Sequence, residues 1–359
     1  MNNNILRKFF KNKKVIITGH TGFKGSWLAL WLNLLGAKVL GLSSNFPTKP
    51  CHFKLLNLKK ILSKKIDIRN FKLINKEIKR FKPDYVFHLA AQAIVKKSYS
   101  EPLETFSTNL IGTLNILESL KQNNKETISI IITSDKSYKN IETNRGYVES
   151  DILGGDDPYG ASKSAADIAV NSYVKSFFNN KYNKNFVAVA RAGNVIGGGD
   201  WTEDRLIPDC MKSWLKKKHV KIRNPNSTRP WQHVLDVIYG YLILAVNLKK
   251  NKKIHGEAFN FGPNMKNNYK VIEILRKSKK YWPSIKWKIQ INKKFKENHL
   301  LNLNNKKAKN TIKWKPNLNL DKTIKLTIEW YKHYSLNKKK IKSKSISQIE
   351  NFNKLIKKL

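Results

Sequence analysis

A glycine-rich turn near the N-terminus constrains the fold of this 359-residue chain more than any other segment. Residues 14–18 (Lys-Val-Ile-Ile-Thr) predict a buried strand, and the apolar residues up to 35 predict a helix. Between them, residues 18–25 read Thr-Gly-His-Thr-Gly-Phe-Lys-Gly. Such a turn lets the backbone approach a pyrophosphate at a helix N-terminus. We therefore expect a dinucleotide to contact Gly19, Thr21, Gly22, Phe23, Lys24 and Gly25.

Strand and helix patterns continue to alternate up to residue 191. Strands are expected at 38–42, 66–68, 84–90, 128–134 and 186–191, and helices at 71–81, at 102–122 and after 158. This alternation predicts a parallel sheet with helices on both faces. The expected fold class is α/β, a Rossmann-type doubly wound parallel sheet with a smaller C-terminal substrate-binding domain.

The pattern becomes less regular beyond residue 195, where Trp, Pro and loop signals are frequent. We predict that residues 10–192 form the dinucleotide-binding domain and that 193–335 mainly bind substrate. Residues 336–359 are rich in Lys, Asn, Ser and Ile and lack clear caps. They predict a basic tail that is either a frayed helix or disordered.

The formal net charge of +45 would ordinarily indicate a nucleic-acid or anionic partner. Only 9 of the 70 basic residues are Arg, and the Lys are spread along the chain. Biased coding composition explains that distribution more simply than a binding face, so no specific nucleic-acid partner is expected. Two cysteines exclude a cysteine-based metal cluster and fit a reducing, cytoplasmic compartment. The sequence shows no signal peptide and no apolar run of membrane-spanning length.

Four of the arginines lie close together in the sequence, at positions 191, 205, 223 and 229. Arg binds phosphate as a planar fork, so the cluster indicates a phosphate-bearing ligand. Arg205 and Arg229 can clamp a diphosphate. Trp201 and Trp231 can stack on a base or sugar, or can belong to the core.

Other segments extend the expected cofactor site. The second strand ends in Ser43-Ser44 rather than in the acidic residue that usually binds the adenosine ribose, so this motif leaves NAD and NADP open. Asp67, next to Ile68, can accept from an adenine amino group or can cap a turn. The residues that follow the fourth strand, which let the backbone pass close to the cofactor, are Leu89, Ala90 and Ala91.

Tyr159 and Lys163 lie four residues apart, so a helix places them on one face. Pro158 suits the first helical position, and Asp156 or Asp157 can cap the helix. An ammonium close to a phenol favours phenolate, which can deprotonate an alcohol during hydride transfer to a nicotinamide. The pair is therefore a candidate both for catalysis and for cofactor binding.

A second pair, Asp135-Lys136, follows Thr133-Ser134 at the end of the fifth strand. In open α/β sheets ligands bind outside the carboxyl ends of the strands. An acid and an amine at that edge can perform proton transfers beyond the one that Tyr159 can manage.

Together these segments resemble the extended short-chain dehydrogenase/reductase superfamily over residues 10–335. Within it, the chain is similar to the CDP-glucose 4,6-dehydratase subfamily, on segments 19–27, 133–136, 153–159, 191–208 and 229–233. Asp-Lys at 135–136 is typical of this subfamily, whereas dTDP-glucose dehydratases carry Asp-Glu and sugar epimerases lack the pair. The chain departs from the pattern at 137–139 and at Gly160, where Ser is more usual.

The resemblance implies a hydro-lyase that uses NAD to convert CDP-D-glucose to CDP-4-dehydro-6-deoxy-D-glucose and water, for deoxysugar and cell-surface polysaccharide biosynthesis. It implies that Tyr159 takes the 4-hydroxyl proton, with Thr133 or Ser134 holding that hydroxyl. Lys136 would be the base at C5 and Asp135 the acid at the 6-hydroxyl, although their roles can be exchanged. The expected substrate contacts are Gln92, Asn194, Arg205, Arg229 and His233.

The alternative within the enzymes is another nucleotide-sugar 4,6-dehydratase or a 4-epimerase. A nucleic-acid-binding protein on a nucleotide-binding fold is a more distant alternative, because it would leave both pairs without a role. The superfamily commonly dimerises through the helix that carries the Tyr, so we expect a homo-oligomer, either a dimer or a tetramer.

Overall fold

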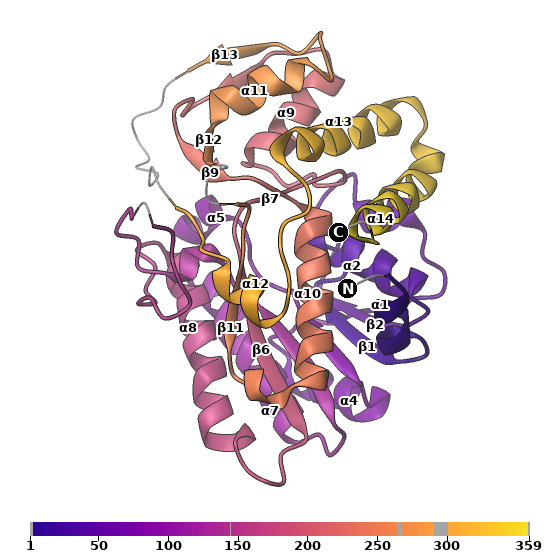
Figure 1. Ribbon diagram of the computed structural model, residues 1–359, viewed down its shortest axis with the longest axis vertical. Coiled ribbons are helices and arrows are strands. Elements are labelled where there is room, and N and C mark those ends of the chain that lie inside the picture. The colour runs from indigo at the N-terminus through magenta and orange to yellow at the C-terminus, as the bar shows by residue number, and fades with distance from the viewer. Residues whose placement is uncertain (1–2, 144, 265–267, 291–300, 358–359) are drawn as a thin grey trace.

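The computed structural model of the chain describes residues 3–143, 145–264, 268–290 and 301–357. Its main feature is a seven-stranded sheet (Figure 1). The strands are β1 (Lys14–Thr18), β2 (Lys38–Ser43), β3 (Leu62–Lys65), β4 (Tyr85–His88), β5 (Thr127–Ile132), β6 (Asn185–Ala192) and β11 (Ala258–Phe261). Their order is β3-β2-β1-β4-β5-β6-β11, and every neighbouring pair is parallel. The predicted Rossmann-type doubly wound sheet is therefore confirmed.

Helices cover both faces of the sheet, as the apolar strands predict. Val15 and Ile17 of β1 point into the core on one face, and Ile16 points into the core on the other. The helices that contribute to the first core are α2 (Phe23–Leu34) and α10 (Val234–Lys250). Those of the second core are α4 (Phe71–Phe81), α7 (Gly112–Lys121) and α8 (Pro158–Tyr173). No helix in the described ranges is both long and apolar enough to cross a membrane.

Two predicted elements differ from the structure. The third strand is β3, which ends just before the predicted segment 66–68. This strand lies at the sheet edge with little burial, so its sequence lacks an apolar run, and the buried Ile66 and Ile68 follow it. The predicted helix 102–122 is divided into α6 (Pro102–Phe106), a π-helical turn (Ser107–Ile111) and α7.

The second half of the chain builds three small sheets and also returns to the main sheet. The small sheets pair β7 (Val195–Ile196) with β10 (Gln232–His233), β9 (Thr228–Pro230) with β12 (Asn268–Lys270), and β8 (Val220–Ile222) with β13 (Trp287–Ile289). β11 and α10 belong to the main sheet and its cover. The domain boundary at residue 192 stays a prediction.

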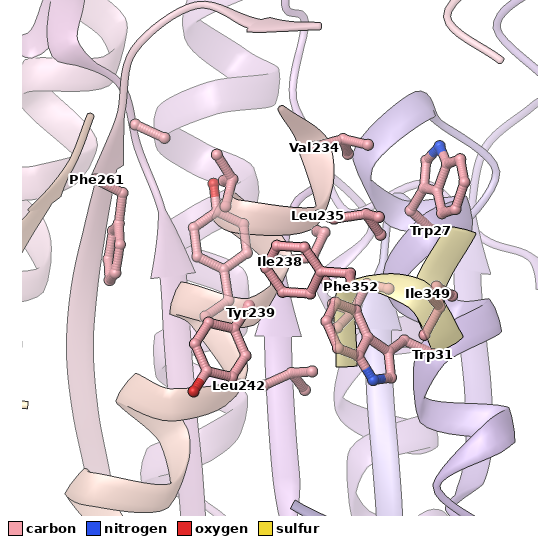
Figure 2. Packing of buried hydrophobic residues seen from close by; sticks show 14 of the residues in the cluster. Trp27, Trp31, Val234, Leu235, Ile238, Tyr239, Leu242, Phe261, Ile349 and Phe352 are labelled. Carbon is pink, nitrogen blue, oxygen red and sulfur yellow. The ribbon is translucent and has the colours of Figure 1, made fainter. Parts of the chain in front are cut away.

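The C-terminal segment is folded, so the expectation of a frayed or disordered tail is wrong for residues 341–357. α13 (Leu320–Leu336) is followed by α14 (Ile341–Lys357), which packs back onto the first face of the sheet. The Phe352 ring lies 5.7 Å from the Trp31 ring and 5.8 Å from the Tyr239 ring, centroid to centroid. Figure 2 shows Phe352 and Ile349 against Trp31.

A buried histidine joins α14 to the glycine-rich segment 197–199. His52, in α3 (His52–Leu56), contacts Ser26 Oγ through Nδ1 at 2.8 Å and Ser345 Oγ through Nε2 at 3.3 Å. Burial lowers the pKa of His52 to about 3, so the imidazole is neutral at physiological pH. A Cβ at Gly199 would lie 2.6 Å from this imidazole. The C-terminal helix therefore supports the loop that leads to Arg205.

Candidate active site

The turn between β1 and α2 fits the close approach of a dinucleotide. Gly19 has φ +73°, and a Cβ there would lie 2.7 Å from the amide nitrogen of Ala90. At Gly25 a Cβ would lie 2.1 Å from the carbonyl oxygen of Gly19. Gly22 is the N-cap of α2 and has no side chain to bond the first N–H groups. The turn therefore presents bare backbone at a helix N-terminus, as a pyrophosphate requires.

Side chains around the turn tie three strand ends together. Thr18 Oγ1 accepts from the amide of Ala90 at 3.2 Å and contacts His88 Nδ1 at 2.7 Å. Thr21 Oγ1 donates to the carbonyl of Asn45 at 2.7 Å, beyond the end of β2. The ends of β1, β2 and β4 therefore keep a fixed spacing at the crevice where the strand order reverses.

Asp67 forms a turn of its own. Its carboxylate accepts from the Arg69 amide at 2.9 Å and from the Arg69 guanidinium at 2.6 Å. These Arg69 contacts lower the pKa of Asp67. The sequence left two roles open for Asp67, and the structure shows the turn. A contact between Asp67 and adenine stays a prediction. The neighbouring Ile68 is buried, and a Cβ at Gly112 would lie 2.4 Å from its Cδ1.

The start of α8 carries the Tyr–Lys pair. Pro158 occupies the first turn, and Asp157 is the N-cap, because its Oδ1 accepts from the amide of Gly160 at 2.9 Å. The Tyr159 and Lys163 side chains are both buried. The predicted cap and first helical position are therefore confirmed, with Asp157 rather than Asp156 as the cap.

The acid–amine pair lies in a short 3-10 turn (Asp135–Ser137) directly after β5. Ser134 Oγ donates to Asp135 Oδ1 at 2.9 Å, and the same side chain acts to lower the pKa of Tyr159. Lys136 Nζ lies 3.2 Å from Asp157 Oδ2, on the carboxylate that caps α8. The structure therefore brings the five predicted catalytic residues onto two adjoining elements, the 3-10 turn and α8.

Burial dominates the protonation of this site. It raises the pKa of Tyr159, against the Ser134 hydrogen bond and the positive charge of Arg205. It also lowers the pKa of Lys163 to about 7, with the nearby Lys24 charge adding to the effect. Lys163 Nζ donates to the carbonyl of Ile132 at 3.2 Å. The phenol is therefore the favoured form of Tyr159 in the free protein, whereas the sequence predicted that Lys163 would hold a phenolate.

Asp135 is suited to hold a proton. Its carboxylate is buried, which raises its pKa against the opposing effects of the Ser134 hydrogen bond and of Lys136. A raised pKa makes the protonated carboxyl, which is the form that can donate a proton, more populated than in an exposed Asp.

Gly160 explains one departure from the family pattern. A Cβ at this position would lie 2.8 Å from the carbonyl oxygen of Lys136. A Cβ at Gly155 would lie 2.2 Å from the carbonyl carbon of Gly160. The 3-10 turn and α8 therefore approach more closely than a side chain at position 160 would permit.

The predicted substrate residues differ in what they contact. Arg205 donates to the carbonyl of Ala93 at 3.0 Å. Its positive charge acts to lower the pKa of both Tyr159 and Lys24. The positive charge of Arg229 acts to lower the pKa of Asp135. These two guanidinium groups therefore border the two catalytic elements. Asn194 accepts through its backbone carbonyl from the amide of Gln232 at 3.2 Å.

Two further predicted substrate residues are buried. Gln92 Oε1 accepts from the amide of Ile94 at 2.7 Å, and Gln92 Nε2 donates to Thr105 Oγ1 at 2.9 Å. This side chain therefore braces its own loop. His233 is the N-cap of α10, and its Nε2 has no hydrogen-bond partner among the described residues. The substrate contacts of both residues stay predictions.

Arg191 does not belong to a phosphate cluster, so the sequence interpretation is wrong for this arginine. Its buried guanidinium is bonded to Asp167 of α8, through Nε at 2.8 Å and a terminal nitrogen at 2.9 Å. Arg223 pairs with Asp204 at 3.3 Å. Trp201 packs against Trp330 and other rings, which is the core role that the sequence left open.

Sequence reasoning missed the residues that connect the two catalytic elements. Asp157 was expected only as a cap, and Asp167 was not considered. A signal for both was present in the sequence. Arg191 is a charge within the apolar strand β6, and such a charge requires a buried partner. Asp167 lies four residues after Lys163, so it shares the face of α8 that carries the Tyr–Lys pair.

The fold and this site define an enzyme of the short-chain dehydrogenase/reductase type, with a dinucleotide turn, a Tyr–Lys pair and an additional acid–amine pair. Residues 16–327 match the family model described as GDP-mannose 4,6 dehydratase. The chain is 42% identical over 331 residues to the CDP-glucose 4,6-dehydratase of Salmonella typhimurium, covering 91% of this chain and 92% of that protein. It therefore belongs to the GDP-mannose 4,6-dehydratase family.

Solved structures share the fold. An epimerase from Methanothermobacter thermautotrophicus superposes with a TM-score of 0.81 at 22% identity, covering 92% of this chain and 95% of that chain. The dTDP-glucose 4,6-dehydratase of Bacillus anthracis, in complex with NAD, gives 0.73 at 21% identity, covering 89% and 96%.

Proposed function

We propose that this protein removes water from CDP-D-glucose and yields CDP-4-dehydro-6-deoxy-D-glucose, using tightly held NAD. The observation that carries the proposal is the buried Asp135 carboxyl beside the buried Tyr159 phenol, with the Ser134 hydroxyl donating to that carboxyl at 2.9 Å. A simple dehydrogenase or epimerase requires the phenol alone. A dehydratase requires a second acid–base group beside it.

Tyr159 is the proposed base for the 4-hydroxyl. Burial favours its phenol form in the free protein and the Arg205 charge favours phenolate, so Tyr159 acts as a base once its phenol proton has passed to the Asp135 carboxylate. The chemistry that NAD supplies is reversible hydride acceptance, so the hydride lost from C4 returns at C6 and no cofactor is consumed. Residues 19–25 and Lys163 are proposed to hold the dinucleotide.

The second pair is proposed to eliminate water once C4 is a ketone, because the ketone acidifies the proton at C5. Lys136 first passes its ammonium proton to Asp157, its ion-pair partner, and the neutral amine then takes the proton from C5. Asp135 gives a proton to the 6-hydroxyl, which leaves as water, and its raised pKa suits this role. Lys136 then returns its proton to C5. The proton that Tyr159 took from O4 balances the one that leaves with the water.

The nucleotide part of the proposal is supported by the relative named CDP-glucose 4,6-dehydratase, which the chain matches over nearly its full length. Arg205 and Arg229 are the proposed diphosphate ligands because both guanidinium groups are near enough to the catalytic residues to lower the pKa of Tyr159 and Asp135, respectively. An Arg fork matches the geometry of a phosphate.

The test is incubation of the purified protein with CDP-, dTDP- and UDP-glucose in separate reactions, with NAD added. We expect a 4-keto-6-deoxy sugar from the CDP substrate alone, identified by NMR and by the loss of one water in the mass spectrum. A galactose product would show a 4-epimerase. A keto product from dTDP- or UDP-glucose instead would show a dehydratase of another nucleotide sugar.

We also propose a homo-oligomer, supported by exposed apolar residues on the α6–α7 segment and α8. Ile111 is 45% exposed and Ile168 is 56% exposed. Sedimentation of wild type and of an Ile168→Lys variant measures the assembly directly, and a monomeric wild type would contradict it.

A further inference from the structure

The buried ion pair between Asp167 and Arg191 contacts the chain on both sides of the 3-10 turn. Thr133, two residues before Asp135, donates through Oγ1 to Asp167 Oδ2 at 3.1 Å. Tyr138, directly after the turn, accepts through its hydroxyl from an Arg191 guanidinium nitrogen at 2.8 Å. The residues that precede and follow the acid–amine pair are therefore attached to one ion pair.

The same ion pair is fixed to the helix that carries the other catalytic pair. Asp167 lies one helical turn after Lys163 on α8, and Arg191 binds both of its carboxylate oxygens from β6. The Arg191 and Asp167 side chains are each only 5% exposed. The two-point contact permits little rotation, because a guanidinium fork fixes the plane of the carboxylate.

Further contacts hold the outer side of the arginine. Arg191 donates to the carbonyl of Glu149 at 3.0 Å, and its guanidinium carbon lies 4.8 Å from the centre of the Tyr138 ring. The Tyr138 hydroxyl donates in turn to Asn260 Oδ1 at 2.8 Å, in β11. The network therefore reaches from α8 across β6 to the strand at the sheet edge.

A buried ion pair is a poor source of stability, since apolar residues of similar volume often serve as well or better. Its geometric specificity is the property that apolar residues cannot supply. We propose that Asp167 and Arg191 are positioning residues that fix the Asp135-Lys136 turn relative to the Tyr159-Lys163 helix. This inference rests on the proposed function. It adds that the rate of elimination depends more strongly on the Asp167–Arg191 ion pair than the rate of C4 oxidation does.

The unequal dependence follows from the two elements themselves. α8 is 16 residues long and keeps Tyr159 and Lys163 in register by its own backbone hydrogen bonds. The turn has three residues and takes its position from Thr133 and Tyr138 on either side and from the Ser164 hydroxyl, which donates to the Ser137 carbonyl at 2.7 Å. Loosening the ion pair therefore displaces Asp135 and Lys136 first.

The test compares Tyr138→Phe with Tyr147→Phe. The two rings stack on each other at 5.1 Å, and each variant loses one hydroxyl. The Tyr138 hydroxyl contacts Arg191, whereas the Tyr147 hydroxyl contacts Asn140 and the amide of Ile141. Arg191→Lys removes the two-point fork on Asp167.

Single-turnover reactions with CDP-glucose separate the two steps. Absorbance of reduced nicotinamide reports C4 oxidation, and NMR reports the keto product. We expect Tyr138→Phe and Arg191→Lys to slow elimination roughly tenfold or more while C4 oxidation changes less than about twofold. Reduced nicotinamide then accumulates. Tyr147→Phe is expected to behave as wild type.

Equal losses in both steps, or equal behaviour of Tyr138→Phe and Tyr147→Phe, would overturn the positioning role. Thermal melting of each variant identifies one that has lost its fold, and the hydroxyl variants keep the test decisive if Arg191→Lys does so. A wild type that fails to dehydrate CDP-glucose would instead refute the proposed function, which is a separate outcome.

Discussion

The two halves of the active site are positioned by different means. Tyr159 and Lys163 lie on a regular helix whose N-terminus is capped by Asp157 and whose inner face is buried. Asp135 and Lys136 lie in a three-residue turn between β5 and an irregular loop. A helix fixes its side chains through local hydrogen bonds, whereas a turn of this length requires contacts from elsewhere in the fold.

The difference shows where the chemistry of the site is sensitive to change. Variants along α8 that spare Tyr159, Lys163 and the residues that contact the turn or its ion pair, such as Gly160 and Asp167, are expected to affect stability more than catalysis. Variants around the turn are expected to affect the elimination step even when the fold is intact. The four predictions that follow test this contrast, beginning with the largest effect.

Tyr159→Phe should abolish both oxidation and elimination, because elimination requires the ketone that Tyr159 helps to form. The expected loss of product formation is roughly 100- to 10,000-fold, as for a general base. Tyr173→Phe is the matched control, since this tyrosine lies on the same helix and its hydroxyl donates to Glu118 at 3.2 Å. Near-normal turnover of Tyr159→Phe would refute its assigned role.

Lys136→Met should stop the reaction after the first step. Elimination is expected to fall about 100-fold or more, because the base at C5 is lost, while C4 oxidation continues. Reduced nicotinamide should then accumulate without a keto-deoxy product. The exposed Lys139 provides the control as Lys139→Met. Normal dehydration by Lys136→Met would remove Lys136 from the mechanism.

Gly160→Ala tests how closely the two elements must approach. The added methyl group would lie 2.8 Å from the Lys136 carbonyl, so the turn or the helix must move. We expect elimination to slow roughly tenfold with a smaller effect on C4 oxidation. If thermal melting and both rates are unchanged, the close approach has no functional consequence.

Lys163→Met should change how stability depends on pH. The pKa of Lys163 is lowered to about 7 in the folded protein and is about 10.4 when unfolded, so between these values the unfolded chain binds more protons. Stability of the NAD-free wild type should therefore rise with pH over that range, and the lysine contributes at most ~1.4 kcal/mol per pH unit.

Urea unfolding at several pH values measures this slope, which Lys163→Met should reduce. Lys175→Met, which changes an exposed lysine in the π-helical turn (Val174–Phe178) directly after α8, should leave the slope unchanged. Identical slopes in wild type and Lys163→Met would show that the lysine is not desolvated as described.

The sheet could be predicted from the sequence because its buried parallel strands are mostly apolar, as in the Ile residues of β5 and the Phe, Val and Ala residues of β6. β3 could not be placed correctly, since an edge strand of Leu-Ser-Lys-Lys has no apolar pattern. α14 was missed for a related reason. Its buried face includes Ser345, Gln348 and Asn353 beside Ile349 and Phe352, so polar residues interrupt the helical period.

The site was predicted as far as local motifs reach. The glycine turn, the cap at Asp157 and both pairs follow from residues that are near one another in sequence. The contacts of Arg191 with Asp167, and of Tyr138 with Asn260, join residues 24 and 122 positions apart. A single sequence shows that a buried arginine requires a partner but does not identify which acid provides it.

The place of α14 makes one side of the core depend on two parts of the chain that are far apart in sequence. Ser345 and Phe352 of α14 contact His52 and Trp31. Until residues 341–357 have been synthesised, the face of α2 around Trp31 lacks part of its cover and the His52 imidazole lacks one of its partners. Completion of the sheet, whose last strand in chain order is β11, therefore does not by itself close this side of the core during synthesis.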